Sequence, residues 1–246
     1  MPSPAIQRLF NYLGYELARL PALDPAYRDL PDSKFYRPVF SPWFGYGDFA
    51  HFYEIARSRS VVSADRCWVL YCLALQSVAV AGDLWECGVY KGGTAAMLAE
   101  ILSRNPSDPS KRLHLFDTFE GMPETDPEKD LHLEGDFADT SLTAVKEYVR
   151  HDSVVEYHQG FIPETFAGLQ DARIAFAHID VDIHRSIIDC CELIYPRLSV
   201  GGTMVFDDYG FASCPGARQA VDEFFKETAV VPLVLPTGQA VVFKSI

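Results

Sequence analysis

Hydrophobic and polar residues follow two different periods along the chain from Val61 onward. Some segments place apolar residues every three to four positions, as helices do, and others are short apolar runs, as buried strands are. The predicted helices span residues 67–80, 94–102, 142–149, 185–195 and 217–226, and the predicted strands span 83–89, 113–116, 154–158, 174–181 and 203–207. This alternation is typical of an α/β fold with a mostly parallel sheet. Residues 230–235 and 239–244 predict a closing antiparallel hairpin around Gly238.

The beginning of the chain has a different character, so we divide it into an N-terminal arm or lid, residues 1–60, and a main domain, residues 61–246. Aromatic residues and prolines crowd residues 35–52, where proline and glycine prevent a long helix. These aromatic side chains either pack the arm onto the body or a second subunit, or form a wall that faces a substrate. Nearer the start, an amphipathic helix is predicted, and its apolar face suits a lid or the contact of a homodimer or higher homo-oligomer. Its apolar residues are Ile6, Leu9, Phe10, Leu13 and Leu17.

Composition and charge narrow the class of protein. No apolar run reaches the roughly 18 residues that span a bilayer, and the start of the chain does not read as a signal peptide, so we expect no membrane contact and a cytoplasmic location. The formal net charge of −13 would repel a phosphate backbone, so nucleic acid is not expected as a partner. The six cysteines form no CxxC pair, so a structural zinc site is not expected.

A glycine-rich turn follows the first predicted strand, and an acid follows the second. The turn reads ECGVYKGGT over residues 86–94, and glycines there allow a close backbone approach to a ligand at the start of a helix. Its GxxxGG spacing differs from GxGxxG, and no GxxxxGK[ST] occurs, which disfavours NAD and ATP. Asp117 follows about 25 residues later, where a carboxylate can accept the hydroxyls of a ribose. Alone, the turn could be a plain tight turn and Asp117 a helix cap, but together they favour a nucleoside site.

Acidic residues follow two further apolar strands. Asp180 and Asp182 come after IAFAHI, and Asp207 and Asp208 come after TMVF. Parallel strands that lie side by side would bring these carboxylates to one edge, where like charges need a cation or a raised pKa. Oxygen ligands without a His/Cys cluster suit a hard ion such as Mg²⁺. We therefore predict Asp180, Asp207 and Asp208 as metal ligands, while strand alternation points Asp182 the other way.

A simpler interpretation of the same acids stays open. They could cap helix starts and pair with Arg185 or Arg218.

Four longer stretches are distinctive in sequence and in order. They are ECGVYKGG (86–93), FDTFEGMPETD (116–126) with GDFADTSL (135–142), HIDVDIHRS (178–186), and FDDYGFASCPGARQAVDEFF (206–225). With their spacing they extend over about two thirds of the chain, from near Asp83 to the C-terminus, and they resemble the macrocin O-methyltransferase family of sugar methyltransferases that use S-adenosylmethionine (SAM). The N-terminal arm carries little of this resemblance.

The resemblance implies a class I SAM-methyltransferase fold with a Rossmann-like sheet, and it implies where SAM binds. Asp117 would hold the ribose of SAM, and Ser141, Gly160 and Phe161 would line its adenine. The residues that would surround the methionine part are Glu86, Gly88, Tyr90, Gly92, Gly93 and Thr94.

The family also implies a metal and a base. Mg²⁺, or another hard divalent cation, would bind Asp180, Asp207 and Asp208, and Asp180 would act as the general base. This chain departs from the family by carrying His184 where a tyrosine is usual. His184 would either touch substrate as an auxiliary proton acceptor or merely hydrogen-bond to its neighbours at a helix start.

We therefore expect a metal-dependent O-methyltransferase that moves the methyl group of SAM to a hydroxyl of a sugar, in a small-molecule or oligosaccharide acceptor. A catechol-type O-methyltransferase acting on a phenolic natural product would share the same sheet, SAM loop and acids. A metal-dependent hydrolase would use the acids but leave the glycine turn and Asp117 without a role. A catalytically silent nucleoside-binding protein is the third alternative.

Overall fold

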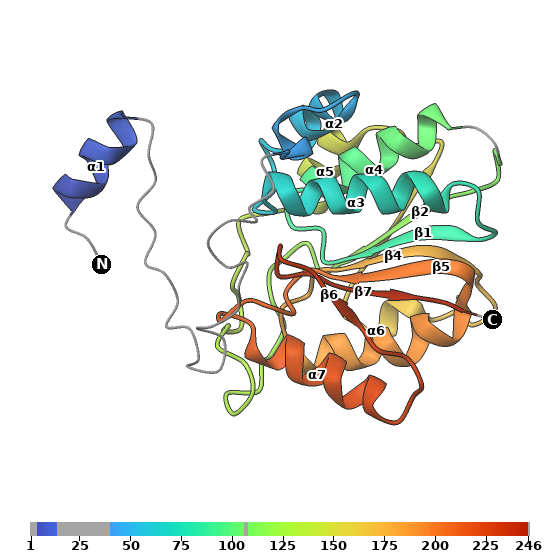
Figure 1. The fold of residues 1–246 in the computed structure, drawn as a ribbon. Helices are drawn as coiled ribbons and strands as arrows, with labels where there is room; N and C mark the ends of the chain where they lie inside the picture. Colours follow the sequence, from blue (N-terminus) through green and yellow to red (C-terminus); the bar gives the residue numbers. More distant parts are fainter. Residues whose placement is uncertain (1–3, 14–39, 106–107, 246) are drawn as a thin grey trace. The chain divides into compact units, whose positions relative to one another are not determined.

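Strands of two to nine residues build a mostly parallel seven-stranded sheet, in the order β3-β2-β1-β4-β5-β7-β6 (Figure 1). The computed structural model describes residues 4–13, 40–105 and 108–245. Strands β1 to β5 are parallel, and β7 runs antiparallel to both β5 and β6. The strands are β1 (Asp83–Cys87), β2 (Leu113–Asp117), β3 (Val155–Gln159), β4 (Ile174–Ile179), β5 (Leu198–Phe206), β6 (Leu233–Val234) and β7 (Ala240–Phe243).

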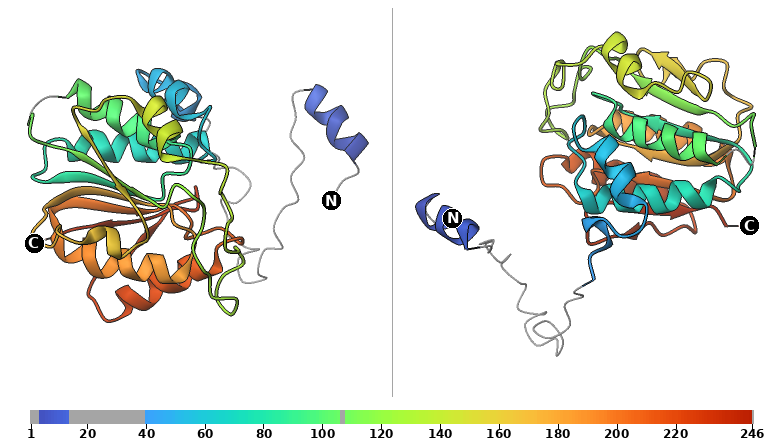
Figure 2. Two further views of the ribbon diagram at one scale, coloured as in Figure 1. Left: turned by 180° about the vertical axis from the view of Figure 1, so that it is seen from behind. Right: turned by 90° about the horizontal axis from the view of Figure 1, so that it is seen from above.

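Helices cover both faces of this sheet, as Figures 1 and 2 show. One face carries α2, α3, α4 and α5, and the other carries α6 and α7. The helices of this unit are α2 (Phe49–Ala56), α3 (Ala64–Ser77), α4 (Gly93–Arg104), α5 (Leu142–Val149), α6 (His184–Arg197) and α7 (Pro215–Lys226), with 3-10 turns η2 (Pro42–Phe44) and η3 (Glu164–Phe166). The predicted α/β fold with a terminal antiparallel hairpin is therefore confirmed.

Burial explains why the inner strands lack alternation. All six residues of β4 are buried, because helices cover this strand on both faces. The core of one layer contains Leu70 and Met97, and the core of the other contains Ile187 and Val221. A continuous apolar run with no polar face is therefore what this position in the sheet requires.

The chain forms two units, Met1–Ser41 and Pro42–Ile246. In the first unit, α1 (Pro4–Tyr12) is the predicted amphipathic helix, with Leu9 and Leu13 exposed. Leu17, also predicted there, lies outside the described residues. Residues 42–60 belong to the second unit rather than to a separate arm, because α2 packs against α3 and α4. A role of residues 1–60 as a lid stays a prediction.

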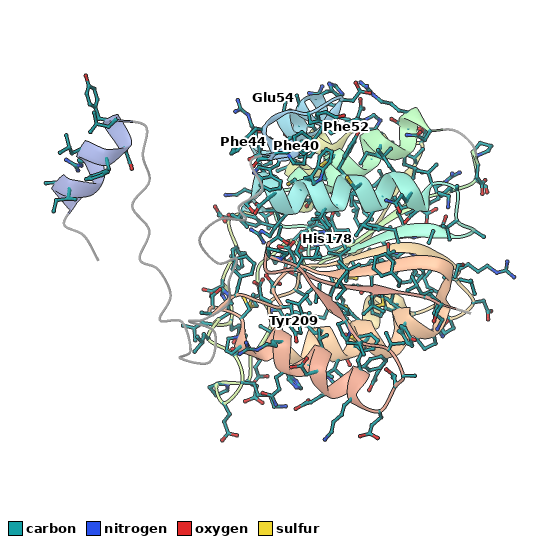
Figure 3. All side chains as sticks on the ribbon, viewed as in Figure 1. Phe40, Phe44, Phe52, Glu54, His178 and Tyr209 are labelled. Carbon is teal, nitrogen blue, oxygen red and sulfur yellow. The ribbon has the colours of Figure 1, made fainter. Side chains whose placement is uncertain are left out.

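The described aromatic residues before α3 include two that are buried against the body of the second unit. Phe49 lies edge-on to Trp68, with ring centres 5.1 Å apart, and Phe52 contacts the ring of Tyr71 at 5.0 Å. Figure 3 labels Phe52 on this side of the sheet, together with Phe44, which is exposed. For Phe49 and Phe52 the structure therefore shows packing onto the body, and residues 35–39 of the aromatic stretch lie outside the described residues.

Three predicted boundaries differ from the structure for local reasons. Strand β1 ends at Cys87 rather than at residue 89, because Gly88 has a φ of +86°. Helix α6 was expected to end before Pro196 but includes it in its last turn. Strand β5 begins five residues earlier than predicted, at Leu198, and its pairing with β4 shifts register near Ile174.

Strands β2 and β4 lie on opposite sides of β1, so the connections diverge at the carboxyl ends of β1 and β4. In open α/β sheets ligands bind at this point. No helix among the described residues is long and apolar enough to cross a membrane.

Candidate active site

The carboxyl ends of the parallel strands surround a cavity of about 310 Å³. This volume lies at the lower end of the range of roughly 300–1,000 Å³ that is usual for small-molecule sites. Its walls come from the loops after β1, β2, β3, β4 and β5 and from residues 59–61 before α3. The cavity therefore occupies the place where the topology predicts a ligand.

Glycine is required where the loop after β1 meets the end of β4. A Cβ on Gly88 would lie 1.8 Å from the carbonyl oxygen of Asp180, and its φ of +86° is one that other residues rarely adopt. The Asp180 N–H also donates to the Cys87 carbonyl at 2.8 Å. Tyr90 and Thr94 of the same loop line the cavity beside Gly88. The loop thus brings the start of α4 to the cavity wall.

Other predicted residues of this loop lie behind the wall. Gly92 and Gly93 carry the backbone into α4, with Gly92 at a φ of +83°, but do not line the cavity. Glu86 is fully buried in β1, where His178 Nδ1 donates to its carboxylate at 2.8 Å. Among the residues predicted to bind the methionine part of SAM, Gly88, Tyr90 and Thr94 line the cavity and can contact a ligand directly. Glu86 does not line the cavity and contacts His178 instead.

Asp117, at the end of β2, holds the two adjacent loops together. Its Oδ2 accepts the backbone N–H groups of Val89 at 2.6 Å and Tyr90 at 2.9 Å, and its Oδ1 accepts that of Phe119 at 2.6 Å. The Thr118 hydroxyl also lies 3.4 Å from Oδ1, but its single hydrogen is closer to the Gly121 carbonyl oxygen, at 2.6 Å between the oxygens. A carboxylate offers about four acceptor positions, so with that hydrogen on Gly121 the Oδ1 atom retains capacity for one donor from a ligand. Asp117 lines the cavity, and its contact with a ribose stays a prediction.

The predicted adenine wall is partly rearranged. Gly160 and Phe161 line the cavity after β3. Ser141 does not line it, because its side chain caps α5 by accepting the Ala144 N–H at 3.3 Å. Its neighbour Thr140 lines the cavity instead and donates its hydroxyl to the Tyr90 carbonyl.

Three of the four acids after β4 and β5 reach the cavity. Asp180, Asp182 and Asp208 line it, and the Asp182 N–H donates to Asp208 Oδ2 at 3.2 Å. The expectation that Asp182 points away is corrected here, because β4 ends at Ile179 and Asp182 has a φ of +58°. Strand alternation no longer applies after the strand has ended.

Asp207 lies beneath the cavity, in a buried network of charges. Its Oδ2 accepts from Arg66 Nη1, and its Oδ1 accepts from Gln239 Nε2 at 2.8 Å. His178 Nε2 lies 3.5 Å from the same Oδ1, and its other ring nitrogen contacts Glu86. Figure 3 labels His178 within the layer of the sheet. This network joins β1, β4 and the end of β5 to α3, and its member Arg66 also lines the cavity.

The acids of the site differ in pKa for identifiable reasons. Burial raises the pKa of Asp180 well above its usual value, and the charge of Asp207 raises it further. Burial also raises the pKa of Asp208, with the charges of Asp180, Asp182 and Asp207 adding to the effect. For Asp207, burial acts to raise the pKa, but hydrogen bonding and the charge of His178, followed by the charge of Arg66, bring it below its usual value.

The chemistry of these donors fits a hard divalent cation. Asp180 is half-buried and Asp208 is buried, both line the cavity, and the hydrogen bond to the Asp208 side chain among the described residues comes from the backbone N–H of Asp182 rather than from a cation. Arg66 and His178 are directed at Asp207 and Glu86 instead. A cation beside Asp180 and Asp208 would offset the repulsion that raises their pKa values. Asp207 is near enough to contribute, but its oxygens already accept from Arg66 and Gln239.

His184 lies outside the cavity lining, at the first residue of α6. Its backbone N–H donates to Asp130 at 2.9 Å, and its Nε2 donates to Glu223 of α7 at 2.8 Å. Lys129 Nζ lies 3.4 Å from its Nδ1. The second of the two roles considered for His184, hydrogen bonding to its neighbours at a helix start, is the one the geometry supports.

Replacing His184 by Gln is expected to leave turnover within about threefold of the wild type and to lower the free energy of unfolding by about 1 kcal/mol, the usual net value of one hydrogen bond. Turnover and urea unfolding of the purified variant check this. A loss of turnover beyond about tenfold in a folded variant would restore the proton-acceptor role.

The side chains at or under the cavity that were not predicted from the sequence include four titratable ones. Arg66 and His178 hold the buried acids, while His132 and Cys214 line the cavity. The only local sign was a polar residue, His178, inside the otherwise apolar run IAFAHI. His132 lies in the long connection between β2 and α5, where no periodicity indicates which side chain faces inward.

The sheet order and the cavity at its carboxyl edge define the class I SAM-methyltransferase fold. The solved structure described as the O-methyltransferase NovP superposes on this chain with a TM-score of 0.68 over 76% of this chain and 83% of that chain, at 23% identity. The sequence model of the family described as Macrocin-O-methyltransferase (TylF) matches residues 72–243. The chain belongs to this family.

Two curated relatives have more specific descriptions. The 8-demethyl-8-(2,3-dimethoxy-alpha-L-rhamnosyl)-tetracenomycin-C 4'-O-methyltransferase of Streptomyces olivaceus is 33% identical over 156 residues, which are 59% of this chain and 58% of the relative. The mycinamicin III 3''-O-methyltransferase of Micromonospora griseorubida is 30% identical over 158 residues, 59% of this chain and 61% of the relative. The match thus spans about six tenths of each relative's length.

Proposed function

We propose that this chain transfers the methyl group of SAM to a hydroxyl oxygen of a sugar in a natural product or saccharide, with the help of a hard divalent cation, Mg²⁺. The observation that carries the proposal is the pair of acids Asp180, which is half-buried, and Asp208, which is buried; both face the same cavity as the glycine loop and Asp117. Membership of the family and the descriptions of the two relatives support the sugar acceptor.

The side of the cavity formed by the loops after β1, β2 and β3 is proposed for SAM. The start of α4 offers backbone N–H groups to the SAM carboxylate, and Thr94 lies there in the wall. Asp117 can accept a ribose hydroxyl with its remaining position at Oδ1. Gly160 and Phe161 supply a flat, apolar wall for the adenine.

Asp180 is proposed as the general base. Methyl transfer is an in-line displacement: the acceptor oxygen bonds to the methyl carbon, the bond from carbon to sulfur breaks, and the hydroxyl proton leaves. Asp180 is half-buried and lines the cavity, where its carboxylate can accept the hydroxyl proton as the acceptor oxygen attacks. A divalent cation bound beside Asp180 and Asp208 would lower the pKa of the acceptor hydroxyl and orient it. Holding both reactants in line supplies much of the remaining acceleration.

Two measurements on the purified full chain test this proposal. Calorimetry is expected to show SAM binding, and a panel of glycosides and catechols is expected to show methylation of a glycoside that stops with EDTA and returns with Mg²⁺. Methylation of catechols alone would establish the phenolic alternative. Failure to bind SAM would contradict the methyltransferase assignment itself.

A homo-oligomer is proposed as well, because Leu9 of α1 and Leu13, the residue after its end, are exposed apolar side chains. Light scattering coupled to size-exclusion chromatography would measure the molar mass, and a monomer at micromolar concentration would contradict this part of the proposal.

A further inference from the structure

Three side chains from distant parts of the sequence form a mixed cluster in the cavity wall. His132, Asp182 and Cys214 all line the cavity, and one ligand atom from each lies within 4.8 Å of the others. They come from the connection between β2 and α5, the loop after β4, and the residue before α7. Unlike Asp180 and Asp208, this cluster contains a sulfur and an imidazole nitrogen.

The spacing of the three atoms matches the edges of a metal tetrahedron. Cys214 Sγ lies 3.3 Å from Asp182 Oδ1 and 3.7 Å from His132 Nε2, and His132 Nε2 lies 3.7 Å from Asp182 Oδ1. With zinc bond lengths of about 2.0–2.3 Å, the ligand atoms of a tetrahedral site are about 3.4–3.6 Å apart. The observed distances lie within about 0.3 Å of these values. The three side chains are thus already close to the arrangement that a tetrahedral cation requires.

A neighbouring carboxylate orients the imidazole as it does in metal sites. His132 Nδ1 donates to Asp136 Oδ2 at 3.0 Å, and the backbone N–H of Leu133 donates to the same oxygen at 3.1 Å. Because an ionised carboxylate only accepts, Nδ1 carries the hydrogen, and in the neutral ring Nε2 presents its lone pair to Asp182 and Cys214. Histidine ligands of metals almost always donate their second nitrogen to such a partner.

The ligand set identifies the class of cation. Thiolate and imidazole favour Zn²⁺ and related borderline ions such as Co²⁺ over Mg²⁺, which prefers oxygen alone. Three protein ligands in a cavity wall leave a fourth tetrahedral position for water or a ligand, as in catalytic zinc sites. On binding, Cys214 would lose its thiol proton to solvent and form the S–metal bond as thiolate.

We propose that His132, Asp182 and Cys214 form a second metal site, for a thiophilic divalent cation of the Zn²⁺ class, with its open position directed into the cavity. The site is separate in chemistry from the oxygen ligands proposed for Mg²⁺. It goes beyond the methyltransferase proposal and does not depend on it.

Cobalt is the probe for this site, because a Co²⁺–thiolate bond gives a near-ultraviolet charge-transfer band. The full chain is first treated with EDTA, dialysed, and kept in excess Mg²⁺ so that the oxygen sites are occupied. One equivalent of Co²⁺ is expected to produce the band, and one equivalent of Zn²⁺ to remove it by displacement. Cys214→Ser is expected to lose the band, whereas the matched control Cys72→Ser, a half-buried cysteine outside the cluster, is expected to keep it.

Asp136→Asn keeps every proposed ligand and is expected to weaken Co²⁺ binding by about 10–100-fold without abolishing the band at saturation. If Cys214→Ser does not fold, the Asp136→Asn variant provides the test of the second metal site. The proposal is overturned if the wild type shows no charge-transfer band, if Cys214→Ser shows the same band, or if Asp136→Asn binds Co²⁺ as tightly as the wild type. SAM calorimetry on the same samples separates this outcome from that of the methyltransferase proposal, since a chain that binds SAM but shows no band contradicts the second metal site alone.

Discussion

Replacing Asp180 by Asn is expected to lower turnover at least about 100-fold while the protein stays folded and still binds SAM. Asparagine keeps the shape of the side chain but neither takes a proton at neutral pH nor offers a charged oxygen to a cation. Asp180 is half-buried and lines the cavity, and desolvation together with the charge of Asp207 raises its pKa. The free energy of unfolding is expected to stay the same or to rise, since the substitution removes a buried charge.

The same chemical change at an exposed acid provides the control. Asp171→Asn lies outside the cavity on the surface and is expected to retain wild-type turnover. Initial rates at saturating SAM and acceptor, with calorimetry for SAM binding, make the comparison. Near-normal turnover in a folded Asp180→Asn variant would remove Asp180 from the reaction.

Replacing Arg66 by Met is expected to lower the free energy of unfolding by about 3 kcal/mol, the lower end of the loss when one partner of a buried ion pair is removed. Arg66 Nη1 pairs with Asp207, which is fully buried, while Nη2 donates to the Val61 carbonyl at 2.9 Å and Nε to Ser63 Oγ at 3.2 Å. Methionine fills a similar volume but makes none of these bonds. Asp207 would then keep its charge with His178 and Gln239 as its remaining partners.

Urea unfolding at neutral pH without added metal measures this loss. The exposed ion pair of Arg57 with Glu54 supplies the control, because Arg57→Met is expected to change stability by less than about 0.5 kcal/mol. Figure 3 labels Glu54. Adding Asp207→Asn to Arg66→Met is expected to recover part of the stability, since the unpaired charge is then gone. An Arg66→Met variant within 1 kcal/mol of the wild type would show that the pair contributes little.

Local periodicity predicted most of the elements. The helix predicted over residues 142–149 coincides with α5, which Ser141 caps. Apolar runs such as IAFAHI predicted β4, because a strand buried on both faces needs apolar residues throughout. These features depend on residues a few positions apart, so the sequence pattern carries them directly.

The candidate site was predicted less completely. The positions after β1, β2, β4 and β5 were predicted because parallel strands end at one edge. The sequence did not predict which of the two adjacent acids faces the cavity. Asp208 lines the cavity, whereas the Asp207 carboxylate pairs with Arg66. Asp182 reaches the cavity through a positive φ that alternation does not predict.

The sequence by itself determined the kind and order of the elements, the glycine at position 88, and the supply of acids at one end of the sheet, because each follows from sterics and periodicity within short segments. Tertiary structure alone decided which distant groups meet. Arg66 pairs with Asp207 across 141 positions of the sequence, and His132 approaches Cys214 across 82. Such contacts depend on how helices pack on the sheet and on how long loops close over its edge, and no local pattern encodes that arrangement.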